Sequence, residues 1–264
     1  MPDEDILIEK ADGIATVTLN RPHRLNALTS EMIQVGLPAM WAGLQEDPKV
    51  KVVIFTGAGE RAFCSGMDVK EAAASPDWGQ QRQPGSGGGS RLTARHNRFT
   101  KPVIAAVNGI CSGGGLMFVS DSDISIAAEN ATFFNPGVAI GQMATFAPIT
   151  WTRWVPFQAL MRMSIVGGKE RLSAEDAKGF GMITEVVPPD RLLPRAREIA
   201  DMIAQCSPTA VRMVKRTLWE AMEFNLEDAH ANGVRIMGEF RGHPDMTEGP
   251  RAFAEKRTPN WVED

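Results

Sequence analysis

Two glycine-bearing turns, each between a strand-like run and a helix-like run, limit most strongly how this chain can fold. The first turn, residues 63–68, follows the apolar run 50–55, and the second, residues 113–117, follows the run 103–107. Strand, turn and helix in this order are typical of an α/β domain. A helix that starts at or just after Gly113 carries free N–H groups and a partial positive charge at its start. The turns therefore predict a pocket whose backbone N–H groups stabilise a developing oxyanion.

The length and composition predict a soluble globular protein with one large domain or two smaller ones. The chain has 264 residues, of which 43% are hydrophobic. A net charge of -4 argues against a nucleic-acid-binding protein and against a protein that binds a membrane surface through a basic face. No apolar run approaches the roughly 20 residues that span a bilayer, and the acidic start of the chain differs from a signal peptide. We therefore expect a cytoplasmic protein.

The cysteines and histidines predict neither a disulfide framework nor a metal site. Cys64, Cys111 and Cys206 are irregularly spaced, so we expect structural thiols, although the first two lie beside the glycine turns. The four histidines have no ligand spacing; His96 precedes the strand that leads to the second turn and can approach the pocket. Residues 57–62 match a loose G-x-G-x-x-A pattern, but the chain continues as a loop instead of opening a helix. A turn is favoured there, and a dinucleotide-dependent enzyme is the weakest alternative.

Patterning along the chain predicts a β-hairpin first, α/β units next and helices last. Residues 6–10 and 14–19 predict the hairpin, and residues 29–45 predict a helix that kinks or breaks at Pro38. After residue 173 we expect one strand, at 183–187, among helices. These are expected at 174–179, 191–205, 208–224, 226–240 and 250–256. Residues 75–90, rich in Gly, Gln and Pro, are either a tolerated surface insertion or a lid over the ligand.

Over nearly its full length the sequence resembles the crotonase (enoyl-CoA hydratase/isomerase) superfamily. Several short stretches match the family pattern, and they occur in the family's order. They are residues 19–22 (LNRP), 25–28 (LNAL), 62–71 (AFCSGMDVKE), 101–109 (KPVIAAVNG), 113–115 (GGG), 122–131, 172–177 (LSAEDA) and 248–257 (EGPRAFAEKR).

The resemblance implies an α/β fold in which a crotonase-like spiral of ββα units is followed by a C-terminal helical trimerisation region. Residues 1–188 would form the spiral core with the acyl-CoA pocket, and residues 189–264 the helical region. The family also implies a homotrimer or a hexamer built as a dimer of trimers. Its ligand is an acyl-CoA thioester, so coenzyme A is part of the substrate and no separate cofactor is expected.

The resemblance also implies which residues meet the substrate. The thioester oxygen would lie between the backbone N–H groups of Met67 and Gly114, in agreement with the argument from the two turns. Lys256 and Arg257 would meet the phosphates, across a subunit boundary. The coenzyme would be lined by His23, Arg24, Leu25, Ala27, Met67, Asp68, Val69 and Lys70.

The sequence departs from the family where a hydratase carries its two glutamates. Met117 and Gly137 occupy those positions, where they would line the acyl pocket but exchange no proton, so simple enoyl-CoA hydration is not expected. Residues 142–146, where isomerase and dehalogenase members carry an aspartate, contain no acid either. Asp121, one helical turn beyond Met117, and Glu71, beside the first turn, are candidate substitute bases. Isomerisation, thioester hydrolysis and decarboxylation through a relocated acid remain open, as does a non-catalytic acyl-CoA-binding protein.

Overall fold

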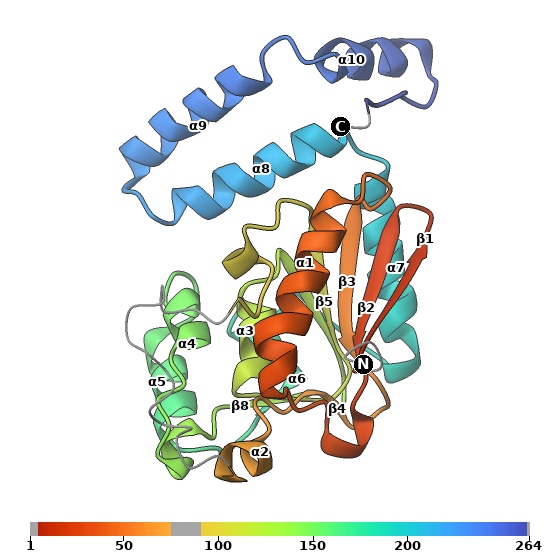
Figure 1. The fold of residues 1–264 in the computed structure, drawn as a ribbon. Helices are drawn as coiled ribbons and strands as arrows, with labels where there is room; N and C mark the ends of the chain where they lie inside the picture. Colours follow the sequence, from red (N-terminus) through yellow and green to blue (C-terminus); the bar gives the residue numbers. More distant parts are fainter. Residues whose placement is uncertain (1–4, 75–90, 263–264) are drawn as a thin grey trace.

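A six-stranded sheet forms the centre of the computed structural model, which describes residues 5–74 and 91–262. In spatial order its strands are β1 (Ile6–Ala11), β2 (Ile14–Leu19), β3 (Val52–Gly57), β5 (Val103–Val107), β7 (Ile124–Ala128) and β10 (Glu185–Val187). The predicted hairpin is confirmed, because β1 pairs antiparallel with β2. The remaining neighbours pair in parallel, as expected for an α/β domain (Figure 1).

The chain passes three times from the six-stranded sheet to a second, smaller sheet. Its strands are β4 (Ala62–Cys64), β6 (Ile110–Ser112), β8 (Thr132–Phe134) and β9 (Leu172–Ser173). The chain passes from β3 to β4, from β5 to β6 and from β7 to β8. The helices α2 (Val69–Ala74) and α3 (Gly114–Ser120) follow β4 and β6 respectively. This succession is the predicted spiral of ββα units.

Helices cover both faces of the six-stranded sheet. On one face lies α1 (Leu37–Glu46), whose Trp41 and Leu44 are buried. A π-helical turn, η3 (Met32–Gly36), runs directly into it, so the predicted break at Pro38 is wrong: the helical geometry changes before this proline, which lies in the first turn of α1. On the other face, α7 (Leu192–Ala204) buries Leu192, Ala196 and Ala200, which recur every four residues along one stripe.

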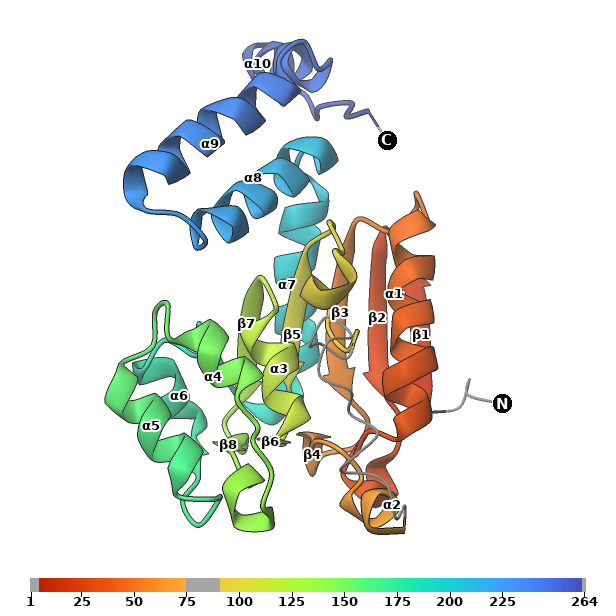
Figure 2. The same cartoon turned by 60° about the vertical axis from the view of Figure 1, so that its left-hand side comes forward.

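Shorter helices connect these layers. The 3₁₀ turns are η2 (Pro22–Arg24), η4 (Arg95–Asn97), η5 (Gly137–Ile140) and η6 (Pro189–Arg191). The α-helices between β8 and β10 are α4 (Phe146–Trp151), α5 (Phe157–Ile165) and α6 (Ala174–Gly179). Figure 2 shows α4 and α5 on the side of α3 away from β3. The region 75–90, considered above as a lid, lies outside the described residues.

The last three helices are set apart from the sheet (Figure 2). They are α8 (Pro208–Ala221), α9 (Leu226–Phe240) and α10 (Asp245–Glu255). The prediction that the last helix starts at residue 250 is wrong, because α10 begins at Asp245 and contains Pro250 in its interior. Proline often starts a helix, but here side-chain contacts at Asp245 stabilise a helical turn before Pro250. One of them is the short hydrogen bond that Ser207 Oγ donates to the buried Asp245 carboxylate.

A largely buried ion pair docks α8 onto the sheet. Lys215 Nζ lies 2.8 Å from the Asp123 carboxylate, which also accepts hydrogen bonds from Trp219 Nε1 and from the backbone N–H of Val103, both at 2.7 Å. Burial lowers the pKa of Lys215, and Asp123 only partly opposes this. In the described part of the chain, no helix is long and apolar enough to cross a membrane.

Candidate functional site

The two glycine turns predicted from sequence lie against each other. A Cβ atom added to Gly66 would lie 3.1 Å from the amide nitrogen of Gly114 and 3.0 Å from the carbonyl oxygen of Ser112. Gly66 and Gly113 have φ values of +93° and +54°, in the left-handed region that glycine adopts without strain. Backbone therefore approaches backbone closely at this point, and no side chain of either residue stands between the turns.

The backbone around Met67 is oriented by a parallel bridge to Leu28. The Leu28 N–H donates to Gly66 O at 2.8 Å, and the Asp68 N–H donates to Leu28 O at 2.9 Å. In a parallel bridge the residue between two such groups directs its own N–H to the opposite side. The Met67 N–H therefore points away from Leu28.

Gly114 is the first residue of α3, so its N–H has no acceptor within the helix. Across residues 5–74 and 91–262, no hydrogen bond from this N–H is found. The next residue, Gly115, is required by contact with β4, because a Cβ atom there would lie 2.3 Å from Cys64 O. The turn is thus held against β4 with its first amide available to a ligand.

Two predictions concern residues beside the turns: the thiols of Cys64 and Cys111, and the run 57–62. Burial raises the pKa of the Cys64 thiol to about 12 and places that of Cys111 well above its ordinary value, so both thiols stay protonated at neutral pH, as structural thiols do. After Gly57 the chain turns and enters strand β4, so the prediction that it continues as a loop is wrong for Ala62–Cys64, although no helix opens there. The interpretation of residues 57–62 as a turn is therefore confirmed, and a helix-opening dinucleotide fingerprint is absent there.

Asn26 ties the predicted coenzyme-binding loop to the first glycine turn. This buried side chain donates to the carbonyl oxygens of Ala58 at 3.0 Å and Ala62 at 2.7 Å, and its Oδ1 accepts the Arg21 N–H. Leu25 adds a backbone bond, because its carbonyl oxygen accepts the Ser65 N–H at 3.1 Å. Asn26 was not among the predicted site residues. Its presence in the matching stretch 25–28 was the available signal.

Most of the predicted coenzyme-binding residues cluster around this loop. Ala27 is buried, whereas His23, Arg24, Val69 and Lys70 are exposed. Asp68 supports the cluster by accepting from the backbone N–H of Lys70 and of Glu71 and from the Arg21 guanidinium. Burial opposes ionisation of Asp68, but these donors outweigh it and hold its pKa below the ordinary value.

The two positions of the expected glutamates hold a buried methionine, Met117, and a crowded glycine, Gly137. Met117 is buried in α3 with 9% of its surface exposed. A Cβ atom on Gly137 would lie 2.8 Å from Gln142 O and 3.0 Å from the Ala144 Cβ. Asn135 fixes this arrangement, because its amide donates to Ala144 O and its oxygen accepts the Gly137 N–H. Residue 137 therefore has no room for a side chain unless this loop moves.

An apolar cavity of about 260 Å³ adjoins this loop, between η5, α4 and α5. Ala144 belongs to its wall and also faces Gly137. The cavity is lined by Asn135, Val138, Met143, Ala144, Thr145, Pro148, Ile149, Thr152, Phe157, Leu160, Met161, Ser164 and Ile165. A surface of this composition accommodates hydrocarbon better than charged groups.

The two candidate bases have partners within the chain. Glu71 accepts the backbone N–H of Ser30 at 3.2 Å, at the start of the helical segment before η3. Asp121 follows α3, with 4% of its side chain exposed, and accepts the hydroxyl of Thr93 at 2.7 Å. Thr150 on α4 donates to the other oxygen at 3.3 Å. Asp121 is therefore surrounded by hydroxyl groups one helical turn beyond Met117.

Lys256 and Arg257 are remote from the glycine turns of their own chain. They follow α10, at the opposite end of the molecule from α2 in both views (Figures 1 and 2). Arg257 binds Glu248 and Glu255, and these carboxylates raise its pKa. A single chain therefore does not bring these two cations to the turns.

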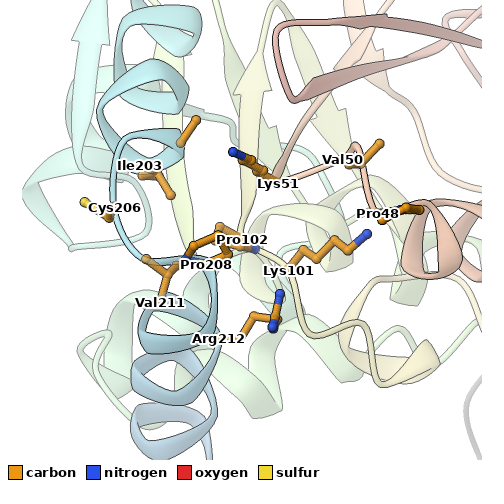
Figure 3. A pocket seen from close by; sticks show the side chains of 11 residues that line it. Pro48, Val50, Lys51, Lys101, Pro102, Ile203, Cys206, Pro208, Val211 and Arg212 are labelled. Carbon is orange, nitrogen blue, oxygen red and sulfur yellow. The ribbon is translucent and has the colours of Figure 1, made fainter. Parts of the chain in front are cut away.

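A second hollow, shown in Figure 3, lies at the opposite ends of the strands from the glycine turns. Val50 and Pro102 in its wall precede β3 and β5, whereas the glycine turns follow the far ends of these strands. Lys101 and Arg212 bring positive charge to it, but its volume of about 20 Å³ is room for one water molecule. It is too small for an acyl-CoA.

Comparison with known proteins agrees with this architecture. The family model for enoyl-CoA hydratase/isomerase matches residues 9–264. Enoyl-CoA hydratase EchA19 of Mycobacterium tuberculosis is 35% identical over 97% of this chain and 96% of its own length. The (E)-benzylidenesuccinyl-CoA hydratase of Thauera aromatica is 33% identical over 96% of this chain and 97% of its own.

Solved structures give the same result. An enoyl-CoA hydratase/isomerase from Mycobacterium paratuberculosis superposes with a TM-score of 0.86 and 40% identity, covering 98% of this chain and 99% of that one. An enoyl-CoA hydratase from Mycobacterium tuberculosis gives a TM-score of 0.87 at 29% identity, covering 99% and 100%. The protein is therefore an enzyme of the enoyl-CoA hydratase/isomerase family, within the crotonase superfamily.

Proposed function

We propose that this enzyme binds an acyl-CoA thioester with its carbonyl oxygen between the N–H groups of Met67 and Gly114. The observation that carries the proposal is the contact of the two turns, which brings Gly66 against Gly114. Negative charge that develops on this oxygen, in an enolate or a tetrahedral intermediate, is stabilised by both amides. In enzymes of known kinetics one such donor contributes about 2.7–4 kcal/mol to transition-state stabilisation. Coenzyme A enters as part of the substrate, and no separate cofactor is needed.

The reaction we propose is not simple hydration of an enoyl-CoA. Neither Met117 nor Gly137 can transfer a proton to or from water, and the space at Gly137 is taken by Ala144 and Gln142 O. The names of the relatives support acyl-CoA chemistry on varied acyl groups, since they include a benzylidenesuccinyl-CoA hydratase and a carnitinyl-CoA dehydratase. Double-bond migration, thioester hydrolysis and decarboxylation each use the same oxyanion stabilisation.

We further propose that the chain assembles as a homotrimer, or as a hexamer of two trimers. Support comes from large apolar side chains exposed on α8 and α9, among them Leu218, Val234 and Met237. In such an assembly Lys256 and Arg257 would reach the coenzyme of a neighbouring subunit. Sedimentation velocity tests the assembly, and a monomer at micromolar concentration would contradict it.

The experiment that tests the activity combines binding with product analysis. Butyryl-CoA and crotonyl-CoA are titrated calorimetrically, and mixtures with a panel of enoyl-, hydroxyacyl- and carboxyacyl-CoAs are analysed by mass spectrometry. Loss of α-deuterium from deuterated butyryl-CoA in ordinary water reports the enolate directly. We expect binding of both thioesters and turnover other than rapid hydration of crotonyl-CoA. Binding without any product or exchange would identify a non-catalytic acyl-CoA-binding member, and no binding would contradict the proposal.

A further inference from the structure

A cluster of polar side chains links the end of α3, the helix that starts at the second glycine turn, to the segment before β5. Its members are Thr93, His96, Asp121 and Thr150. The Asp121 Oδ2 accepts the Thr93 hydroxyl at 2.7 Å, and Oδ1 accepts the Thr150 hydroxyl at 3.3 Å. Among the residues that the structure describes, Asp121 has no lysine or arginine partner, and His96 Nδ1 lies 3.9 Å from its Oδ2. Ser120 Oγ also donates to Oδ1, at 3.3 Å, and a buried carboxylate held by hydroxyl groups without a lysine or arginine is unusual.

For a neutral His96 ring beside an ionised Asp121, the hydrogen bonds of this cluster decide which ring nitrogen carries the proton. Thr93 Oγ1 lies 3.0 Å from His96 Nδ1. The hydroxyl has a single proton, which goes to the Asp121 carboxylate because that group only accepts. The bond between Thr93 and His96 must therefore use the proton on Nδ1, and Nε2 is left as an acceptor. Asp121 acts through Thr93 to set this tautomer.

The cluster adjoins the second glycine turn through the end of α3 and through the segment 92–96. Asp121, which directly follows α3, is four residues after Met117, so it lies about one turn, or about 5.4 Å, further along the helix axis. Leu92 comes within 3.8 Å of a Cβ atom added to Gly114, so the segment from Leu92 to His96 runs from the turn to the cluster. The His96 ring is 24% exposed and meets the edge of Phe146, 6.3 Å away between ring centres.

We propose that His96 Nε2 accepts a hydrogen bond from a hydroxyl group on the distal part of the acyl moiety, so that acyl-CoAs with a hydroxyl group far from the thioester are the substrate class. This inference rests on the proposed function, because the thioester end must be held at Met67 and Gly114. Asp121 and Thr93 are positioning residues that keep Nε2 an acceptor. A carboxylate on the ligand is disfavoured by the nearby charge of Asp121, and an ether oxygen is disfavoured because it cannot donate.

Calorimetric titration with matched ligands tests the proposal. The probes are butyryl-CoA and its ω-hydroxy, ω-methoxy and ω-carboxy forms, with the same set on the hexanoyl chain. For one chain length we expect the ω-hydroxy form to bind at least about fivefold more tightly than the other three. In His96→Leu this preference should fall to about one, while the affinity for acetyl-CoA and the unfolding temperature stay near wild type.

The Asp121→Asn variant separates positioning from packing. An amide at this position can donate to Thr93, whose hydroxyl proton is then free to move to His96 Nδ1, and Nε2 becomes a donor. Hydroxy and methoxy forms should then bind alike, although the side chain has nearly the same size. The exposed His230→Leu in α9 is the matched control and should keep the wild-type preference.

The outcomes are distinct. Equal wild-type affinity for all four forms, a preference for the ω-carboxy form, or a preference that survives in His96→Leu would each overturn the assignment while acyl-CoA binding itself stands. Failure of the wild-type protein to bind even acetyl-CoA would instead show that the proposed function is wrong, and the assignment would fall with it.

Discussion

Gly66 packs against Gly114 so closely that a single methyl group on the first would come within 3.1 Å of the amide nitrogen of the second. Two segments nearly fifty residues apart thus share one small volume of backbone. Glycine is required at Gly66 for two separate reasons, the positive φ and the contact.

The Gly66→Ala variant should therefore lose both stability and ligand affinity. The methyl group meets backbone atoms of Ser112 and Gly114, which cannot rotate away, and alanine is strained at a φ of +93°. We expect a loss of about 1–3 kcal/mol in the free energy of unfolding and at least a tenfold weaker affinity for butyryl-CoA. Urea unfolding and calorimetry measure these quantities.

Gly43 in α1 provides the matched control. It is exposed, and no atom lies within 4 Å of an added Cβ. Gly43→Ala should stabilise the protein by about 0.5–1 kcal/mol and leave the affinity unchanged. A Gly66→Ala variant that binds and unfolds like wild type would show that the turns are not packed as described.

Restoring the two family glutamates should not create a hydratase. In Met117→Glu/Gly137→Glu the second side chain meets Ala144 and Gln142 O, so the loop must shift before a carboxylate can reach the pocket. We expect crotonyl-CoA hydration by this double variant to stay within about tenfold of Met117→Glu alone, as measured by loss of enoyl absorbance. Met143→Glu, at a side chain that is 81% exposed, controls for added negative charge. Hydration raised by several orders of magnitude would contradict the crowding at Gly137.

Thiol labelling should distinguish the three cysteines. Cys64 and Cys111 are buried with raised pKa values, about 12 for Cys64, whereas Cys206 is exposed. A disulfide reagent at neutral pH should modify one thiol per folded chain and all three in denaturant. Cys206→Ser should abolish the rapid reaction. Fast labelling of the folded Cys206→Ser protein would show that a thiol beside the glycine turns is accessible.

The C-terminal segment should become less stable in acid. Glu248 accepts from Arg257 and from the Asn260 N–H, and these donors lower its pKa from 4.5 to about 2. A folded-state pKa below the unfolded value means that the stabilisation is complete above about pH 4.5 and disappears as the pH falls through about 2. The difference in unfolding temperature between wild type and Glu248→Gln should be constant at higher pH and shrink within this window. The exposed Glu129→Gln should show no such trend, and a pH-independent difference for Glu248→Gln would contradict the interaction.

Local patterns predicted most strands of the six-stranded sheet, the turns and most helices, because these are set by short-range periodicity and by glycine. The short strands of the smaller sheet, β4, β6, β8 and β9, were not predicted. β5 and α9 coincide with the predicted ranges. β3 begins two residues later than predicted, because residues 50 and 51 precede the pairing with β2, which starts at Val52. The start of α10 was missed, since contacts of Asp245 with Ser207, distant in sequence, decide it. Such contacts leave no periodic signal.

The functional site could likewise be predicted only in part. The approach of the two turns could be expected from glycine placed after two strands. The crowding at Gly137 could not, because it depends on how Asn135 folds the next nine residues back. The hydroxyl partners of Asp121 come from Thr93 and Thr150, which lie 28 and 29 residues away in opposite directions. Only the three-dimensional arrangement shows that they converge.

A crystal structure of the enzyme with butyryl-CoA tests the central claim most directly. We predict a thioester oxygen within about 3.2 Å of both the Met67 and the Gly114 amide nitrogens. A thioester bound elsewhere, or an oxygen that contacts neither amide, would contradict the account.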